Sequence, residues 1–380
     1  MKTATPVRGR TPVKKEHITS HLRQLIVSGD LTPGTRLPTR TDLEESFQTS
    51  PATVQSALDS LVRDGFVRVQ GRQGTFVAED LPFLTRYGFV FPRRPDAGAS
   101  WPRFFTAIAT ELARLNASGD VDFPSYSNIN EVSSDGWKQL QHDINARRLA
   151  GLVFIAEATE ALRHAPLNGC GLPMACIADK PDLGVPRLYL ESRAVIDRAL
   201  DYLVARGKTR VAVAHFGDWL KDYGAYLDAA LAKRGMSTQP YWMQSFHYTY
   251  PEGATNCMNL LMRSRAIEPF DAIYIADDNI VSAAVEGVVA AGMDACAGVD
   301  IVAHCNFPLI DPSPVPVKRI GFDAKAVVAA AIDIVNSQRD GCADQHVTIH
   351  PVFDHELLGG QSSPNQGARN VNNLSSSTND

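Results

Sequence analysis

The hydrophobic positions of the first eighty residues follow a helical period in three successive stretches. Residues 14–27 carry four apolar side chains on one helical face, namely Ile18, Leu22, Leu25 and Ile26. A second helix is predicted after Thr39, because a threonine N-cap followed three residues later by Asp42 is a helix-start signature. A third helix is predicted after Ser50, with Pro51 at the first helical position, where a missing N–H does no harm.

Two short apolar stretches, residues 66–69 and 75–77, follow the third helix, and the turn between them, residues 71–74, has glycine at both ends. This pattern is typical of a β-hairpin. Three helices followed by a hairpin form a winged helix-turn-helix, whose third helix can place its N-terminal end in a major groove of DNA. We therefore expect a DNA-binding domain over residues 14–78, preceded by a flexible basic arm at residues 1–13.

The rest of the chain, residues 85–358, alternates apolar strands with helices. Ten strands are predicted, over residues 87–91, 121–126, 151–155, 173–177, 187–190, 210–215, 241–246, 271–275, 299–304 and 317–322. Seven helices are predicted between them, over residues 103–116, 136–148, 194–206, 221–233, 253–267, 280–291 and 325–337. This alternation indicates parallel, doubly wound sheets, and ten strands are too many for one sheet of ordinary size. The predicted fold is therefore α/β with two lobes and a cleft, a linker at residues 79–84 and a disordered tail at residues 359–380.

Charge is distributed unevenly along the chain. Residues 1–40 carry eight Lys or Arg against two acidic residues, whereas residues 81–380 carry 26 basic and 33 acidic residues. A basic head on an acidic body indicates a module that binds a polyanion, or else a solvated basic tail. No apolar run approaches the ~18 residues of a membrane helix, the N-terminal arm lacks the apolar centre of a secretory signal, and the six cysteines form no CxxC pair. We expect a cytoplasmic protein without a disulfide scaffold and without membrane contact.

Residues 14–78 closely resemble the DNA-binding domain of GntR-type bacterial transcription regulators. The resemblance rests on an ordered series of matching positions: the run 26–39, Asp42, Leu43, Thr53, Val54, Ala57, Leu58, Leu61, Asp64, Gly65 and the run 71–77. By position in that domain, eight residues are expected to meet phosphates or base edges: Arg36, Thr39, Arg40, Ser50, Thr53, Gln55, Arg72 and Gln73. The family often has Arg where this chain has Thr41, Pro51 and Gln55, so its operator cannot be inferred from that of relatives. Gln55 suits adenine better than guanine.

The body resembles the effector domain of LacI-type regulators, which shares its fold with periplasmic sugar-binding proteins. The clearest parts are residues 199–213 and the strand–Asp–helix–Gly–strand segment 271–302. A GntR-type head on a LacI-like body is the architecture of the arabinose-responsive repressors, so the resemblance implies a small polar, carbohydrate-like effector. Such a ligand binds where strand ends of the two lobes converge, and it needs carboxylates, amides and an aromatic face.

Seven residues are candidates for the effector site: Phe91, Arg93, Trp101, Phe105, Lys221, Asp278 and Asn306. Asp278 aligns with an acid that binds sugar hydroxyls in the family, or it caps the helix that follows. The aromatic residues and Arg93 either contact the ligand or belong to the core or the surface of the lobe. Lys221 approximately replaces an Arg that the family carries early in this helix. Asn306 ends a segment, residues 303–306, that stands where the family has Gly-(Phe/Tyr)-Asp.

The sequence thus predicts a ligand-responsive transcription regulator, and we expect a repressor. It should act as a homodimer on a near-palindromic operator of double-stranded DNA, because two recognition helices must meet half-sites about one helical turn apart. The alternative is an enzyme with an appended DNA-binding head, although no nucleophile elbow or cofactor lysine is recognisable. We expect no cofactor and no metal site. Two histidine pairs have i, i+4 spacing, His17/His21 and His346/His350, but the second pair falls on a predicted strand.

Overall fold

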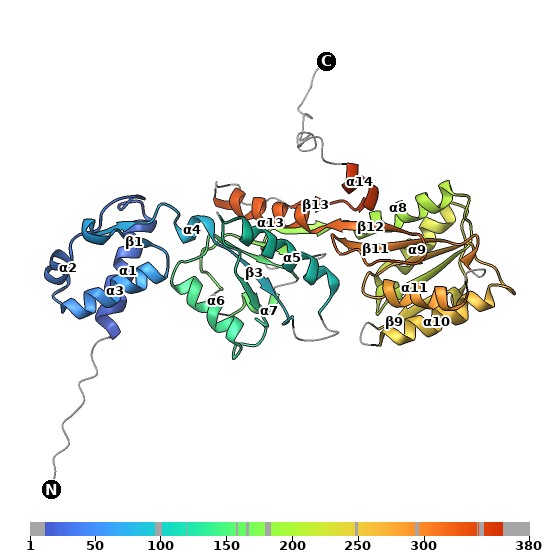
Figure 1. Ribbon diagram of the computed structural model, residues 1–380, viewed down its shortest axis with the longest axis horizontal. Helices are drawn as coiled ribbons and strands as arrows, with labels where there is room; N and C mark the ends of the chain where they lie inside the picture. The colour runs from blue at the N-terminus through green and yellow to red at the C-terminus, as the bar shows by residue number, and fades with distance from the viewer. Residues whose placement is uncertain are drawn as a thin grey trace, which may run out of the picture.

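The computed structural model in Figure 1 describes residues 12–95, 101–119, 121–156, 159–164, 167–178, 184–247, 250–292, 296–339, 341 and 346–359. The predicted arm and tail lie outside the described residues, except for residues 12, 13 and 359, each of which belongs to a helix. A head and two lobes follow one another along the long axis of the molecule.

The head consists of three helices and a hairpin, as predicted. Its elements are α1 (Pro12–Val27), α2 (Arg40–Phe47), α3 (Pro51–Arg63), β1 (Val67–Val69) and β2 (Thr75–Val77), and the two strands pair antiparallel. The apolar faces of the helices and the hairpin enclose a core in which Ile18, Val54 and Leu61 are fully buried. The predicted apolar residues Ile18, Leu22 and Ile26 belong to this core, whereas Leu25 is only half-buried and lies outside it.

Side chains at two helix starts make the hydrogen bonds that the sequence predicts. Thr39 Oγ1 accepts from the N–H of Asp42, and the Asp42 carboxylate accepts from the N–H of Thr39 at 2.8 Å. Ser50 Oγ accepts from the N–H of Thr53 at 3.3 Å, with Pro51 at the first position of α3. These caps fix where α2 and α3 begin, so they set the short turn that presents the start of α3 at the surface.

A buried ion pair joins α1 to the end of α3. Arg23 pairs with Asp64, which is 2% exposed. Replacing Arg23 with Met would leave this carboxylate with Arg63, whose Nε lies 3.6 Å away, as its ion-pair partner among the described residues. Breaking a buried pair from one side costs about 3 kcal/mol or more, so we expect the melting temperature of the head, measured by calorimetry, to fall by about 12 °C or more.

Arg63→Met is the matched control for this prediction. The Arg63 side chain is 67% exposed, and exposed ion pairs contribute about 0–1 kcal/mol. Equal losses of stability in the Arg23 and Arg63 variants would contradict the importance of the buried pair.

The segment predicted as a linker, residues 79–84, contains the start of a short helix, α4 (Pro82–Thr85). Phe83 packs against the apolar core of the head. The carbonyl of Leu84 accepts a hydrogen bond of 3.3 Å from Arg339 of the first lobe. The connection therefore contacts both the head and the first lobe, and it joins them as a short, partly helical joint.

The first lobe is built on a parallel six-stranded sheet in the order β13-β7-β6-β5-β3-β4. Its strands are β3 (Tyr87–Phe91), β4 (Ser125–Ser127), β5 (Gly151–Phe154), β6 (Met174–Ile177), β7 (Arg187–Leu190) and β13 (Val347–Ile349). Its helices are α5 (Arg103–Ser118), α6 (Asp135–Asn145), α7 (Thr159–Leu162) and α13 (Ala324–Arg339). The helices α5 and α13 pack together on one face of this sheet, and α6 covers the other.

The second lobe is built on a six-stranded sheet in the order β14-β12-β11-β10-β8-β9, which is parallel except for β14. Its strands are β8 (Val211–Phe216), β9 (Met243–Phe246), β10 (Ala272–Ile275), β11 (Asp300–Phe307), β12 (Val317–Asp323) and β14 (Val352–Phe353). Its helices are α8 (Ser192–Ala205), α9 (Trp219–Lys233), α10 (Pro251–Ser264), α11 (Val281–Ala290) and α14 (Asp354–Gly359). The two-lobed α/β prediction is confirmed.

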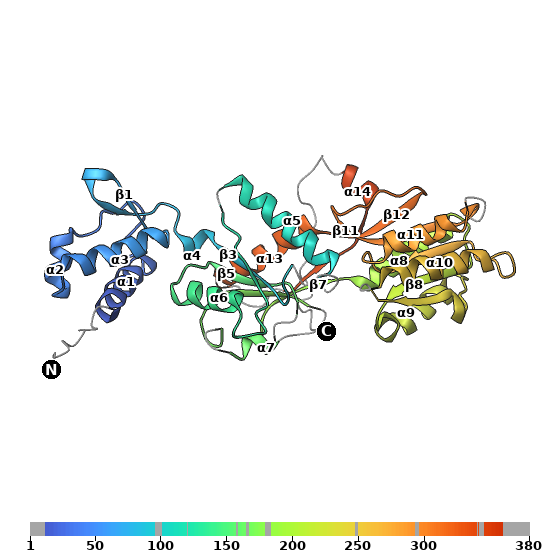
Figure 2. The ribbon, with the colours of Figure 1, turned by 60° about the horizontal axis from the view of Figure 1, so that its bottom comes forward.

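The chain crosses between the two lobes three times (Figure 2). The crossings run from β7 to α8, from β12 to α13 and from β13 to β14. Each sheet therefore contains strands from distant parts of the sequence. Any rotation of one lobe against the other must take place about these short connections.

Every strand and helix predicted for the body is present, most of them with shifted ends, and the structure adds the strands β13 and β14 and the helices α7 and α14. β4 is shorter than the predicted strand 121–126, which contains Pro124, a residue without an N–H for the ladder. β9 begins at Met243 because Pro240–Trp242 form a 3₁₀ turn. Among the helices that the structure describes, none is long and apolar enough to cross a membrane.

Candidate functional site

The turn before α2 and the hairpin form one surface of the head. The N–H of Leu37 donates to the carbonyl of Thr75 at 2.8 Å, so the turn runs alongside β2. This pairing places the Arg36 guanidinium against Gly74, where an added Cβ would lie 2.9 Å from Arg36 Nε. An exposed cation from the turn thus lies beside the hairpin tip that carries Arg72.

Six of the eight residues predicted to contact DNA are exposed on the head: Arg36, Thr39, Arg40, Ser50, Arg72 and Gln73. Thr53 is 5% exposed, and its hydroxyl lies 2.9 Å from Ser50 Oγ. The prediction of a DNA contact by Thr53 is therefore corrected, because this side chain belongs to the cap of α3. Gln55 is half-buried and donates from Nε2 to Asp59 at 2.6 Å, a bond it would exchange on meeting a base.

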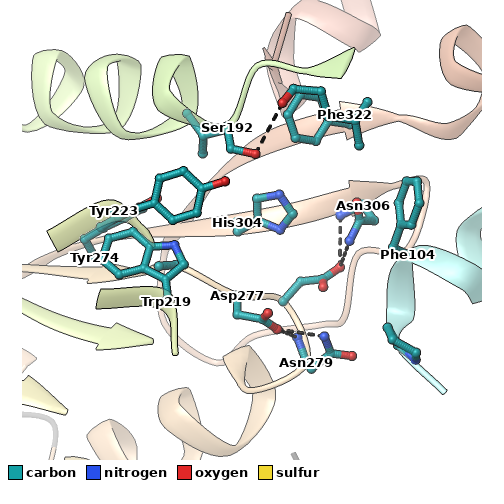
Figure 3. A pocket seen from close by; sticks show the side chains of 15 residues that line it. Phe104, Ser192, Trp219, Tyr223, Tyr274, Asp277, Asn279, His304, Asn306 and Phe322 are labelled. Carbon is teal, nitrogen blue, oxygen red and sulfur yellow. Dashed lines mark hydrogen bonds between the residues drawn. The ribbon is translucent and has the colours of Figure 1, made fainter. Parts of the chain in front are cut away.

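A cavity of about 250 Å³ opens between the two lobes (Figure 3). The first lobe contributes Pro102 and Phe104 near the start of α5, and Leu190 at the end of β7. The second lobe contributes Ser192, Val195, Trp219, Tyr223, Tyr274, Ala276, Asp277, Asp278, Asn279, His304, Asn306 and Phe322. The cavity thus lies at the carboxyl ends of parallel strands, where open α/β sheets bind their ligands.

Three rings form one wall of the cavity, the aromatic wall, which consists of Trp219, Tyr223 and Tyr274. The ring centroid of Trp219 lies 5.5 Å from that of Tyr223 and 6.2 Å from that of Tyr274. Trp219 also stacks on His215, which is 1% exposed and whose pKa is lowered by burial. A neutral ring therefore supports a wall that suits the C–H face of a small ring or a cation.

Two carboxylates and two amides form the polar side of the cavity. Asp278 Oδ2 accepts two hydrogen bonds of 3.0 Å from Asn306, one from the backbone N–H and one from Nδ2. Asp277 Oδ1 accepts from the N–H and Nδ2 of Asn279 at 2.8 and 2.7 Å. Burial raises the pKa of the Asp278 carboxyl, and the neighbouring His304 partly opposes this rise. All four residues line the cavity, and Figure 3 shows Asp277, Asn279 and Asn306 on this side of it.

Arg103 joins the first lobe to this polar side. Its backbone N–H donates to Asn279 Oδ1 at 2.8 Å, and its Nη2 donates to Asp311 Oδ1 at 3.1 Å and to the carbonyl of Leu309 at 2.9 Å. Its Nε lies 3.6 Å from Asp278 Oδ2. One residue at the start of α5 therefore links the position of the first lobe to the geometry of the carboxylates.

Asp278 and Asn306 are the two predicted effector residues that line the cavity. The structure contradicts the alternative in which Asp278 caps the next helix. Ile280 is the N-cap of α11, which begins at Val281 without a side-chain cap. Asp278 is instead directed to Asn306 and Arg103.

The other five predicted effector residues lie outside the cavity lining in this structure, so their contact with an effector stays a prediction. Phe91, Trp101 and Phe105 pack on one another in the first lobe, with ring centroids 5.2 to 5.9 Å apart. They serve as core, since Phe91 is 1% and Phe105 is 8% exposed. Arg93 and Lys221 are exposed side chains. The residues that the sequence reasoning missed are the aromatic wall, Asp277, Asn279 and His304.

The first histidine pair packs against an aromatic ring of the head. His17 and His21 lie against Phe47, with ring centroids 5.7 and 5.5 Å from that of Phe47. The second pair, His346 and His350, flanks β13, as predicted. Within the part of the chain that the structure describes, no three His, Cys, Asp or Glu side chains are grouped so that they could hold a metal ion.

Comparison with known proteins matches the head to a family of regulators. Residues 14–77 match the model of bacterial regulatory proteins, gntR family. The chain is 32% identical over 116 residues to the uncharacterized HTH-type transcriptional regulator YhdI of Bacillus subtilis, covering 30% of this chain and 22% of the relative. It is 30% identical over 73 residues to the HTH-type transcriptional repressor YtrA of the same organism, covering 19% of this chain and 55% of the relative. The chain therefore spans about a fifth and about half of the lengths of these curated relatives.

The body is similar to solved structures of another class of regulators. One of them is a LacI family transcriptional regulator from Arthrobacter sp. FB24 in complex with lactose, with 14% identity and a TM-score of 0.54. The match covers 71% of this chain and 97% of that one. At this level of identity the likeness shows the fold. The chain thus combines a GntR-type DNA-binding domain with a body that has the fold of LacI-family regulators.

Proposed function

We propose that this protein is a transcription regulator, acting as a repressor, whose affinity for operator DNA is set by a small polar effector bound between its lobes. The observation that carries the proposal is a polar cavity between the lobes, beside which Arg103 of the first lobe contacts Asn279 and Asp278 of the second, on a chain with a GntR-type head. Two neighbours support it: YtrA is named a transcriptional repressor, and the Arthrobacter regulator is in complex with lactose.

The joint between the head and the first lobe is the proposed route of coupling. Because α4 packs on the head core and is held by Arg339 of α13, a rotation of the first lobe would move the base of the head. A ligand that prefers one arrangement of the lobes would then change operator affinity. A coupling of about 1–3 kcal/mol would change it roughly 5- to 150-fold.

We further propose that the protein is a cytoplasmic homodimer that binds a near-palindromic operator. Two copies of α3 are required to meet both half-sites at once. Sedimentation of the full chain, alone and with operator duplex, measures this directly. A single monomer on the duplex would contradict it.

The experiment that tests the proposed function begins with the DNA that purifies with the protein. Sequencing this DNA gives a candidate operator, and fluorescence anisotropy then measures the affinity of the full chain for it at several salt concentrations and with a panel of small polar molecules. We expect salt-sensitive, sequence-selective binding that one ligand class weakens. A ligand that binds the body yet leaves operator affinity unchanged would contradict the proposal. Conversion of that ligand to a product would instead support the alternative of an enzyme with a DNA-binding head.

A further inference from the structure

The cavity between the lobes carries an unbalanced charge. Asp277 and Asp278 both line it, and among the lining residues that the structure describes none is Lys or Arg. Asp278 has a partial counterion in Arg103, whose Nε lies 3.6 Å away, and the neighbouring His304 also favours its charged form. Asp277 has no such counterion among the described residues, because the partner of its carboxylate is the amide of Asn279. At least one negative charge in the lining therefore has no counterion from the protein.

The lining has two strong acceptors, the carboxylates of Asp277 and Asp278, beside N–H and O–H groups of the aromatic wall and His304 that can donate. The amide nitrogens of Asn279 and Asn306 already donate to Asp277 and Asp278, at 2.7 and 3.0 Å. The hydroxyl of Ser192 donates to the carbonyl of Leu190 at 3.4 Å. The second oxygens of both carboxylates are left to accept from a ligand, so the cavity suits a molecule rich in N–H and O–H donors.

The carboxylate of Asp277 acts on the aromatic wall as well. Burial raises the pKa of Tyr274, and the neighbouring Tyr223 and Asp277 contribute to the same rise. The faces of Trp and Tyr attract cations, and a carboxylate adds a full opposite charge. A cation would gain from both, whereas a phosphate or carboxylate group would be repelled by both.

We propose that the effector is a small hydroxylated amine of the amino-sugar type, whose ammonium group binds between Asp277 and the aromatic wall. The inference rests on the proposed function and narrows it. It assigns the ligand a positive charge and sets it apart from neutral sugars and sugar phosphates. The hydroxyl groups of the ligand would donate to Asp278 and to the Oδ1 atom of Asn306.

The test compares ligands that share a ring and differ in charge. D-glucosamine, D-glucose and glucose 6-phosphate, with the corresponding galactose series, are titrated into the full chain by calorimetry at about pH 7. We expect the amine to bind about tenfold tighter than the neutral sugar in at least one series, and the phosphate to bind weakest. A neutral sugar or a phosphate that binds as tightly as its amine would overturn the proposal. So would the failure of both amino sugars to bind at about 10 mM.

Asp277→Asn is the decisive variant. Asn retains an oxygen that can accept from Asn279, so the turn is kept while the charge is removed. We expect the variant to bind the amine about tenfold more weakly and the neutral sugar unchanged. The matched control is Asp311→Asn, which removes a charge that contacts Arg103 outside the cavity lining. Melting temperatures of both variants establish that the fold is kept, and equal loss of amine binding in both would overturn the role of Asp277.

The strongest alternative to a positively charged effector is a negatively charged one that binds the exposed residue Arg93. If closure of the lobes brought Arg93 to the cavity, glucose 6-phosphate would bind tightest and Arg93→Ala would abolish its binding. That result would overturn the charge assignment. The proposed function would still stand if the phosphate released operator DNA, so the two proposals fail in distinguishable ways.

Discussion

Replacing Asp278 with Asn is expected to lower the affinity for the effector roughly 5- to 150-fold while leaving operator binding without ligand unchanged. Asp278 Oδ2 holds Asn306 and lies beside Arg103, so the change weakens the polar side at the point where both lobes meet. A ligand hydroxyl left without its charged acceptor in a desolvated site loses about 1–3 kcal/mol. Calorimetry with the ligand that releases operator DNA from the unaltered protein measures the loss.

Asp311→Asn is the appropriate control for this change as well. Asp311 also accepts from Arg103, but it lies outside the cavity lining. If both variants bind the ligand as the unaltered protein does, Asp278 only fastens β11 to the loop before α11. The proposed ligand contacts would then move to the aromatic wall.

The double variant Arg40→Ala/Arg72→Ala is expected to bind operator DNA about one to two orders of magnitude more weakly near physiological salt. Arg40 is exposed at the start of α2, and Arg72 is exposed at the hairpin tip, beside which Arg36 lies. Each phosphate contact that is lost also lowers the dependence of log affinity on log salt by about 1, so the slope should fall by about 2.

A charge-matched control for the DNA prediction uses two exposed cations of the second lobe, in the variant Lys233→Ala/Arg263→Ala. We expect it to keep the affinity and the salt slope. If the head variant keeps both as well, the head meets DNA through another surface, and the predicted orientation of α3 in the groove is wrong.

Local signals in the sequence predict the head almost completely. The threonine and serine caps, the proline at the start of α3 and the apolar spacing each act within one turn of helix, so they do not depend on the rest of the fold. Thr53 shows the limit of such reasoning. Its position at the start of α3 predicts a DNA contact, yet the hydroxyl is used locally with Ser50.

The effector cavity is harder to predict, because its lining depends on how sheets and helices pack. All five residues of β3 are buried, so the sequence gives no sign that Phe91 belongs to the core rather than to the cavity. Trp219 and Tyr223 do carry a signal, four residues apart on one helical face. The predicted helix begins at residue 221, and since the N-cap of α9, Asp218, makes no side-chain capping bond, nothing local marks the true start.

The three crossings between the lobes bear on how the protein is made. The head and its joint occupy one continuous early segment, whereas each sheet of the body takes an edge strand, β13 or β14, from residues 347–353. Domains near the N-terminus generally fold first during synthesis. A nascent chain can therefore complete its head while both sheets still lack these strands, and the proposed ligand cavity can form only after residues 347–353 have been made.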